Sequence, residues 1–290
     1  LNKLNFEETE STIEKIILDI EKKTGKYLNN VSLMLDTSDA FSISLSVAKN
    51  NESEVITKQD IQYLIQDAKQ QILNSNLDKS IIHIIVNNYK VDDKDYDFLP
   101  LNSKCKNFSI DIIFICFPKS LIKNIEKLFH KHQILVDQLI CSSYAKSYNY
   151  KKHFDEYNKI VFLDVGYEKT SIICYEKNQL KSFDVLPIGG HHITKDIANV
   201  LKLDIDLAEK IKSNLNKNIV FSNNKENNEL FDKDFLGKID KKELSLDLIK
   251  KIIFARIDET LTLSFGLLES KKNKKNKNQL KIILIGQGAK

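Results

Sequence analysis

An apolar strand in the middle of the chain, Val161–Leu163, runs directly into Asp164 and Gly166. A second apolar strand follows, and Gly189 and Gly190 then open a segment with helical spacing. Glycines let backbone N–H groups approach phosphate oxygens closely, and the N-terminus of a helix adds partial positive charge. A carboxylate and glycines in this order therefore predict a site for the phosphates of a nucleotide.

Asp164 ends a strand, so it either lies at a site or caps a turn. Within a site it suits Mg²⁺, because this hard ion takes oxygen ligands and keeps several of its waters. Lys169, in the same loop, can act as a point charge toward a phosphate.

The residues that follow the second strand predict a turn into a helix. Gly189, Gly190 and Thr194 indicate a helix whose first N–H groups are free for a ligand. An ordinary strand-to-helix turn is the alternative. His191 and His192 do not indicate a metal site, because neighbouring side chains at a helix start diverge and zinc needs three or four ligands.

The composition is that of an ordinary globular protein, with 42% hydrophobic and 29% charged residues. The 290 residues can form two compact units or one domain with an inserted one. A net charge of +4 is too balanced to indicate nucleic acid as a partner. The four cysteines form no C-x-x-C pair, which fits core residues in a reducing cytoplasm. We find no signal segment and no apolar run of about 18 residues, so no membrane span is predicted.

The first part of the chain predicts a small α+β domain. Thr57 is the expected N-cap of a helix, with Asp60 three residues further on. An earlier helix is expected over Glu8–Tyr27, with an apolar face of Ile13, Ile16, Ile17 and Ile20. Strands are expected at Val31–Thr37, Phe41–Lys49 and Ile81–Asp93.

The next part alternates apolar strands with amphipathic helices, which predicts a sheet covered on both faces. Beyond Leu215 the chain turns polar, with a short strand expected at Asn218–Phe221. Leu244–Ser270 is predicted as one long helix or two abutting ones. The run Lys271–Asn278 is predicted as a solvated loop, with binding of anionic lipid or nucleic acid as the alternative.

The order and spacing of these motifs resemble the actin-like ATPases. The run IGGHHITKDIA, followed by AEKIK, is most similar to the bacterial cell division family FtsA. The run IIHIIVNNYKVD resembles a strand of the FtsA domain called 1C, through His83, Tyr89 and Asp92. The run VDQLICSSYAKSY resembles the helix that crosses between the halves of the actin fold. The resemblance covers nearly the whole chain.

The resemblance implies an α/β fold of the actin-like, ribonuclease-H-like type, with two lobes and an inserted small α+β domain of the SHS2 or 1C type. It also implies domain ranges, which are 8–103 for 1C, 104–158 for part of 1A, 159–193 with 252–290 for 2A, and 194–251 for 2B.

By the same resemblance, ATP and Mg²⁺ are the cofactors, and Asp164 contacts the Mg²⁺ through water. Glu209 and Lys212 form a surface ion pair in the simplest interpretation, whereas the resemblance gives them the ribose and the adenine edge. Gly286, Gln287 and Gly288 stand where the family has a T-G-G-G-A turn for adenosine. The implied nucleotide-binding residues are Asp164, Gly166, Lys169, Thr170, Gly189, Gly190, Thr194, Glu209, Lys212, Gly286, Gln287 and Gly288.

The phosphate loop departs from the family pattern D-I-G-G-G-T-T-D, because Tyr167 and Glu168 replace two glycines. If these positions require positive φ, each substitution costs roughly 1–2 kcal/mol. Glu168 also places negative charge beside the phosphates. Binding of ATP is therefore expected without efficient hydrolysis; we assign no catalytic residue and expect at most a weak ATPase.

By resemblance, the protein is a structural adaptor of cell division that binds ATP, polymerises and links the FtsZ ring to the cytoplasmic membrane. The C-terminal tail of FtsZ would dock on domain 2B, about 194–251, and later division proteins on domain 1C. The protein would lie in the cytoplasm, peripheral on the inner face of the membrane at the division site. We expect the chain to lack both ends of the family architecture, including the C-terminal membrane helix, as a fragment or a reduced protein. The alternatives are an actin-superfamily ATPase or sugar kinase, and a nucleotide-free scaffold with the same fold.

Overall fold

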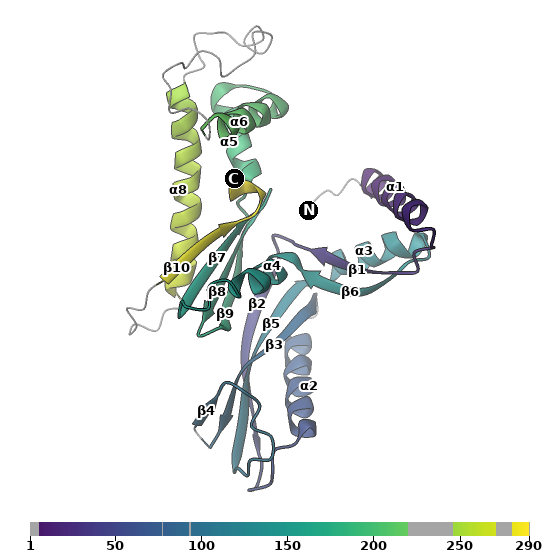
Figure 1. The fold of residues 1–290 in the computed structure, drawn as a ribbon, viewed down its shortest axis with the longest axis vertical. Helices are drawn as coiled ribbons and strands as arrows, with labels where there is room; N and C mark the ends of the chain where they lie inside the picture. The colour runs from purple at the N-terminus through teal and green to yellow at the C-terminus, as the bar shows by residue number, and fades with distance from the viewer. Residues whose placement is uncertain (1–5, 77, 93, 220–245, 271–279, 290) are drawn as a thin grey trace. The chain divides into compact units, whose positions relative to one another are not determined.

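The structure is a computed structural model of the chain, and it describes residues 6–76, 78–92, 94–219, 246–270 and 280–289 (Figure 1). The chain divides into two compact units. Unit 1 comprises Leu1–Val161, Ile173–Val185 and Gln279–Lys281. Unit 2 comprises Phe162–Ile172, Leu186–Asn278 and Ile282–Lys290. The four predicted domain ranges stay a prediction.

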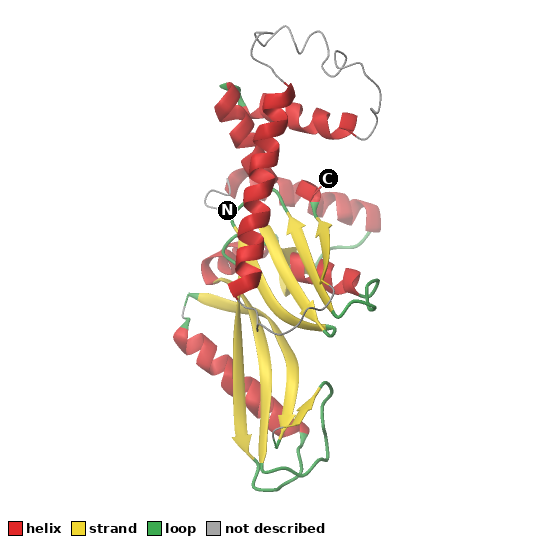
Figure 2. Ribbon diagram, turned by 90° about the vertical axis from the view of Figure 1, so that its left-hand side faces the viewer, coloured by secondary structure: helices red, strands yellow, loops and turns green. Residues whose placement is uncertain are grey.

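One sheet of unit 1 is antiparallel, with the strand order β2-β5-β3-β4. Helix α2 lies along one face of it (Figure 2). The apolar side of α2 packs on alternate residues of β5, because the side chains of a strand point to opposite faces with period two. These elements are β2 (Phe41–Asn50), α2 (Lys58–Ser75), β3 (Lys79–Val91), β4 (Lys94–Tyr96) and β5 (Asn107–Pro118).

The start of α2 confirms the predicted cap. Thr57 is extended, and its hydroxyl accepts a hydrogen bond from the Asp60 N–H at 3.3 Å. The Asp60 carboxylate accepts in return from the Thr57 N–H at 2.8 Å, and it also pairs with the ammonium of Lys49 on β2. The cap therefore fixes both the start of the helix and its contact with the sheet.

This carboxylate predicts a loss of stability in acid. The hydrogen bond from Lys49, followed by those from Thr57, lowers the pKa of Asp60 to about 2. A lowered folded-state pKa gives stability that is complete above the unfolded pKa, about 3.9, and is lost as the pH falls toward 2. We expect hydrogen exchange of α2 amides to report roughly 1–2 kcal/mol less protection at about pH 2.5 than at about pH 5. Asp60→Asn should be less stable at pH 5 and lose much less on acidification; an equal loss in both proteins would contradict the prediction.

A second sheet of unit 1 pairs β1 (Asn30–Leu35) with β6 (Leu135–Cys141) in parallel. The connection between them contains the whole β2-β5-β3-β4 sheet and then α3. Asp36 follows β1 and accepts hydrogen bonds from the Ser143 N–H and hydroxyl, which tie the end of β1 to the start of α4. The helices of this part are α1 (Phe6–Thr24), α3 (Lys119–Lys131) and α4 (Ser142–Lys151).

The apolar face predicted for the first helix is only partly covered. Ile17 is buried, whereas Ile16 is 53% and Ile20 is 37% exposed. Helical spacing places these side chains on one face, but which of them a neighbour covers is decided by tertiary packing. The predicted helix is therefore present, and its apolar face is largely open among the described residues.

The third sheet has the order β10-β7-β8-β9, and its strands contribute residues to both units. The interiors of β7 and β8 are buried on both faces, and each contains a short apolar run, Ile160–Leu163 in β7 and Ile172–Cys174 in β8. The strands are β7 (Lys159–Val165), β8 (Thr170–Glu176), β9 (Gln179–Leu186) and β10 (Leu280–Ile285).

Unit 2 holds the helices α5 (Gly190–Leu201), α6 (Ile205–Ile219) and α8 (Leu246–Ser270), and their core includes Ile197, Ile211 and Ile249. The region predicted as one helix or two is the single helix α8. The strand predicted at Asn218–Phe221 is wrong where it can be judged, because Asn218 and Ile219 belong to α6; its other residues lie outside the described ones. None of the described helices has the length and apolarity to span a membrane.

Candidate functional site

The loop between β7 and β8 keeps a tight backbone turn although it has lost glycines. The Gly166 N–H donates to the Lys169 carbonyl at 2.8 Å, which closes the turn. Neither Tyr167 nor Glu168 is among the residues with positive φ. The condition under which these two replacements would strain the backbone is therefore not met, because neither residue adopts a left-handed conformation.

The first amides of α5 are already bonded. The Gly190 N–H donates to the Gly166 carbonyl at 2.9 Å, and the His191 N–H donates to the Tyr167 carbonyl at 2.7 Å. The Gly189 N–H donates to His192 Nδ1 at 3.1 Å. The prediction that these amides are free for a ligand is therefore wrong: the helix start holds the loop.

The hydrogen bonds from α5 to the loop also fix the direction of the next two loop amides. In a trans peptide the N–H points opposite to the C=O. Because the carbonyls of Gly166 and Tyr167 point to α5, the next amides, those of Tyr167 and Glu168, point away from it. Successive backbone amides that point to one side of a turn can form a donor pair of the kind that binds anions. The direction of these two amides needs no glycine at positions 167 and 168.

Glycines bring three segments together around this loop. A Cβ on Gly189 would lie 2.6 Å from three backbone atoms of the β7–β8 loop. Gly286, with φ +98°, lies so close to β7 that a Cβ would be 2.3 Å from the Val165 carbonyl and 2.6 Å from Asp164 Oδ1. The Gly288 Cα lies 3.5 Å from a Cβ built on Gly190. The loop, the start of α5 and the turn after β10 therefore converge on the end of β7.

Asp164 lies at this convergence and is 3% exposed. The described residues contain no group of three or more His, Cys, Asp or Glu side chains placed to hold a metal. A single carboxylate fits Mg²⁺ in the form the ion usually takes with nucleotides, held by one or two carboxylates, by phosphates and by several waters. It does not fit an all-protein metal site.

Two predicted phosphate-loop side chains make contacts inside the protein. The Lys169 side chain is 9% exposed, and its ammonium donates to the Ser171 hydroxyl. The Thr170 hydroxyl is fully buried and donates to the Ile188 carbonyl at 2.7 Å. Lys169 therefore does not extend as the predicted point charge, and Thr170 supports the segment that leads into α5.

Thr194, Glu209 and Lys212 form one cluster between α5 and α6. The Lys212 ammonium donates to the Gly190 carbonyl at 3.1 Å, to the Thr194 hydroxyl at 2.8 Å and to Glu209 Oε2 at 2.7 Å. These contacts use all three of its donors. Burial raises the pKa of Glu209, but the hydrogen bonds from Lys212 and Thr194 outweigh it and lower the pKa overall. Lys212 therefore joins α5 to α6, while Glu209, 42% exposed on its side chain, stays an ionised acceptor.

The pair that the sequence did not reveal is Tyr167 and His191. Their rings stack at a centroid distance of 4.5 Å and an interplanar angle of 22°. Burial and then the charge of Lys195 lower the pKa of His191, so the imidazole is neutral at pH 7. The stack places the Tyr167 ring against His191 of α5. No signal in the sequence indicated that these two rings stack. The segments of both residues were expected near phosphates, but only because of the aspartate and the glycines beside them.

Gln287 lies between Gly286 and Gly288 in the turn after β10. It is the first residue of the short 3₁₀ turn Gln287–Ala289. The structure therefore brings nine of the twelve predicted residues into two groups. Asp164, Gly166, Gly189, Gly190, Gly286 and Gly288 meet around the β7–β8 loop, and Thr194, Glu209 and Lys212 form the neighbouring cluster through Gly190.

Comparison with known families agrees with this arrangement. The model of "Cell division protein FtsA" matches residues 161–284, and the model of "SHS2 domain inserted in FTSA" matches residues 38–116. Together they match more than half of the chain. The first covers the candidate site up to β10, and the second covers most of the β2-β5-β3-β4 sheet with α2.

Curated relatives extend the similarity over most of the chain. The FtsA of Borreliella burgdorferi is 26% identical over 211 residues, which are 72% of this chain and 51% of the relative. That of Enterococcus faecalis is 24% identical over 268 residues, 92% of this chain and 60% of the relative. The chain thus spans between half and two thirds of the length of these relatives.

A solved structure is similar in fold. The PilM-PilN type IV pilus biogenesis complex superimposes with a TM-score of 0.60 at 12% identity, over 97% of this chain and 68% of the solved chain. The predicted actin-like α/β fold with an inserted SHS2-type domain is confirmed.

Proposed function

We propose that this chain, which belongs to the FtsA family of cell division proteins, binds ATP at the β7–β8 loop and serves as an adaptor in bacterial cell division. One observation carries the proposal. Three glycine-bearing segments converge on the buried Asp164, and the loop beside it directs two backbone amides away from α5. A carboxylate next to a pair of amide donors suits a nucleotide phosphate with its Mg²⁺.

Each part of the site has a separate task in this proposal. The amides of Tyr167 and Glu168 receive phosphate oxygens, and the ionised Glu209 accepts a hydrogen bond from a ribose hydroxyl. Asp164 holds the waters of Mg²⁺, which would neutralise phosphate charge when bound. The Glu168 carboxylate lies on the same loop, and its negative charge repels the phosphates and weakens their binding. We assign no catalytic residue, so the proposed role is binding with at most weak hydrolysis.

The adaptor role rests on membership in the family. We propose that domain 2B, about 194–251, takes the C-terminal tail of FtsZ, and that domain 1C, about 8–103, takes later division proteins. Within 2B the structure describes α5, α6 and the first turns of α8. Polymerisation, and a place on the inner face of the cytoplasmic membrane at the division site, belong to the same proposal.

Exchange of the acidic residue tests the ATP site. Asp164→Asn removes the charge that holds the Mg²⁺ shell and keeps the size of the side chain. We expect ATP affinity in Mg²⁺ to fall by about tenfold or more, which corresponds to about 1.4 kcal/mol, and affinity in EDTA to stay nearly unchanged. Titration of labelled ATP by fluorescence anisotropy measures both. The exposed carboxylate of Asp155 supplies the matched control Asp155→Asn, which should bind as the unaltered chain does.

The nucleotide-free scaffold is favoured by a different observation. The first amides of α5 and all three donors of Lys212 are bonded within the protein. Co-sedimentation of the chain with FtsZ, with and without ATP, separates the two functions. Binding of FtsZ together with a failure to bind ATP supports the scaffold. Binding of ATP without any co-sedimentation of FtsZ rejects the adaptor role.

A further inference from the structure

Helix α3 of unit 1 carries a lysine stripe, which consists of Lys119, Lys123, Lys127 and Lys131. All four side chains are exposed. The four-residue spacing places them along one side of the helix, because residues four apart are neighbours on a helical surface. The opposite side of α3 is apolar and contributes the buried Ile122 and Leu128.

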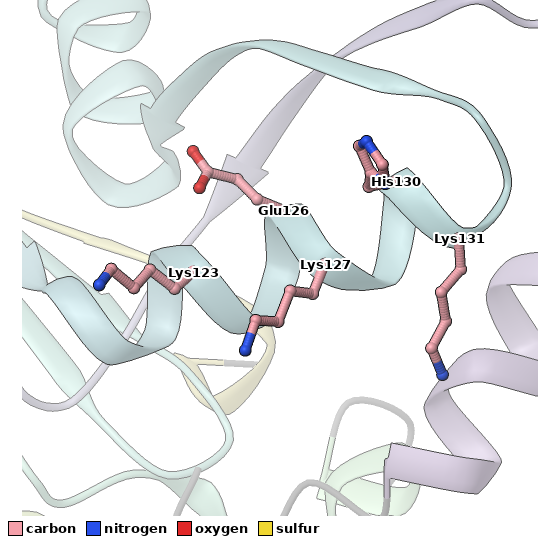
Figure 3. A pocket seen from close by; sticks show the side chains of 5 residues that line it. All are labelled: Lys123, Glu126, Lys127, His130 and Lys131. Carbon is pink, nitrogen blue, oxygen red and sulfur yellow. The ribbon is translucent and has the colours of Figure 1, made fainter.

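The one acidic residue on the exposed side of α3 does not neutralise the stripe. Glu126 lines the same hollow as Lys123 and Lys127, but it projects in a different direction from Lys127 (Figure 3) and forms no ion pair with either lysine among the described residues. Like charges four residues apart repel each other, so the stripe weakens the isolated helix rather than stabilising it. An arrangement of this kind becomes favourable when anions lie along it.

The last lysine of the stripe already binds a carboxylate. The Lys131 ammonium donates to both carboxylate oxygens of Glu10 on α1, at 2.8 and 2.7 Å. The next two lysines, Lys123 and Lys127, form no ion pair or hydrogen bond within the described part of the chain. The same helix face thus has one position occupied by an acidic side chain and two that remain available.

A hollow of about 480 Å³ lies against this face, lined by Lys123, Glu126, Lys127, His130 and Lys131 (Figure 3). Lysine stems can line such a hollow with apolar surface while their ammonium groups stay in water. Lysines four apart on a helix are separated by about 6 Å along the axis. Carboxylates on alternate residues of an extended peptide are about 6.6–6.8 Å apart, which is nearly the same spacing.

We propose that the lysine stripe of α3 binds an acidic peptide segment of a partner protein. An anionic membrane would also have to approach the carboxylates of Glu10 and Glu126, which flank the free lysines, whereas a peptide can place its acids only where the lysines are. This surface lies in unit 1 and is independent of the proposed ATP site in unit 2.

The test uses the whole chain and a fluorescein-labelled peptide of about twelve residues in which glutamate and serine alternate, with glutamine in place of glutamate as its control. Binding is followed by fluorescence anisotropy at about 50 mM and about 300 mM salt. We expect the acidic peptide to bind and the glutamine control not to bind. The higher salt concentration should weaken the binding of the acidic peptide. Lys123→Glu/Lys127→Glu should lower the affinity by about tenfold or more, since two attractions become repulsions.

The matched control is Lys104→Glu/Lys106→Glu, which changes the net charge equally at exposed lysines before β5. It should change the affinity less than about twofold. Equal losses in both variants would mean attraction by net charge and would overturn the proposal. The proposal would also be overturned if the chain bound phosphatidylserine vesicles but not the peptide, and if the α3 variant lost the vesicle binding. That result would make the stripe a membrane-binding surface. Failure to bind either probe would overturn it as well. Circular dichroism checks that both variants fold.

Discussion

Gly189→Ala is expected to destabilise unit 2 by roughly 3–5 kcal/mol, although it adds only one methyl group. The added Cβ would lie 2.6 Å from the Gly166 carbonyl oxygen, the Lys169 nitrogen and the Tyr167 carbonyl oxygen. All three atoms are backbone, so no side chain can turn aside to make room. The loop would have to move from α5 and lose the hydrogen bonds that the Gly190 and His191 amides donate to it.

The adjacent glycine supplies the control. A Cβ on Gly190 would meet its nearest atom, the Gly288 Cα, at 3.5 Å, which is ordinary van der Waals contact. Gly190→Ala should therefore change stability by less than about 1 kcal/mol, since alanine is also the better helix former at the first position of α5. Urea unfolding followed by circular dichroism compares the two variants. If both lose the same stability, the close packing of the loop on Gly189 is wrong.

This contrast marks how far the sequence predicts the site. The glycines and Asp164 stand out because their types and order are unusual beside apolar strands, and the structure brings them together. The residues around the start of α5 do not indicate which acceptors its amides bind. Their acceptors are the carbonyls of Gly166 and Tyr167, more than twenty residues earlier, and every residue type has a carbonyl. A backbone–backbone hydrogen bond requires no particular side chain, so the sequence does not predict it.

The loop itself illustrates the opposite error. Tyr167 and Glu168 suggested strain because glycine in a family pattern is often needed for positive φ. Here the glycines of the pattern are not required for backbone conformation, as neither replacement has positive φ. The ring of Tyr167 finds its place by stacking on His191. Sequence alone could not tell a conformational need for glycine from a need for space.

The secondary structure followed the sequence where local signals were strong. The Thr57 cap and the apolar runs of β5, β7 and β8 predicted their elements, because capping and burial act over a few residues. The end of α6 did not follow. Asn218 and Ile219 carry a strand-like pattern yet continue a helix whose Ile211 and Leu215 are buried in a core with α5 and α8. Tertiary burial of the helix outweighed local β propensity there.

Gly286→Ala and Gly266→Ala should change stability in opposite directions. Gly286 has φ +98°, where an L side chain is strained, and its Cβ would lie 2.3 Å from the Val165 carbonyl oxygen. The clash and the strain together should cost roughly 3 kcal/mol or more. The substitution would also press on Asp164 Oδ1, 2.6 Å from the same Cβ, so the affinity for ATP with Mg²⁺ should fall as well.

Gly266 lies within α8, and a Cβ there would meet no atom within 4 Å. Its replacement removes a residue that costs a helix roughly 0.5–1 kcal/mol relative to alanine, so Gly266→Ala should raise the free energy of unfolding by about that amount. Thermal and urea unfolding of the two variants measure the sign directly. A destabilised Gly266→Ala would mean that this side of α8 is covered by a partner or by more of the protein. An unaffected Gly286→Ala would mean that the turn after β10 does not pack on Asp164, and the proposed ATP site would lose one of its three converging segments.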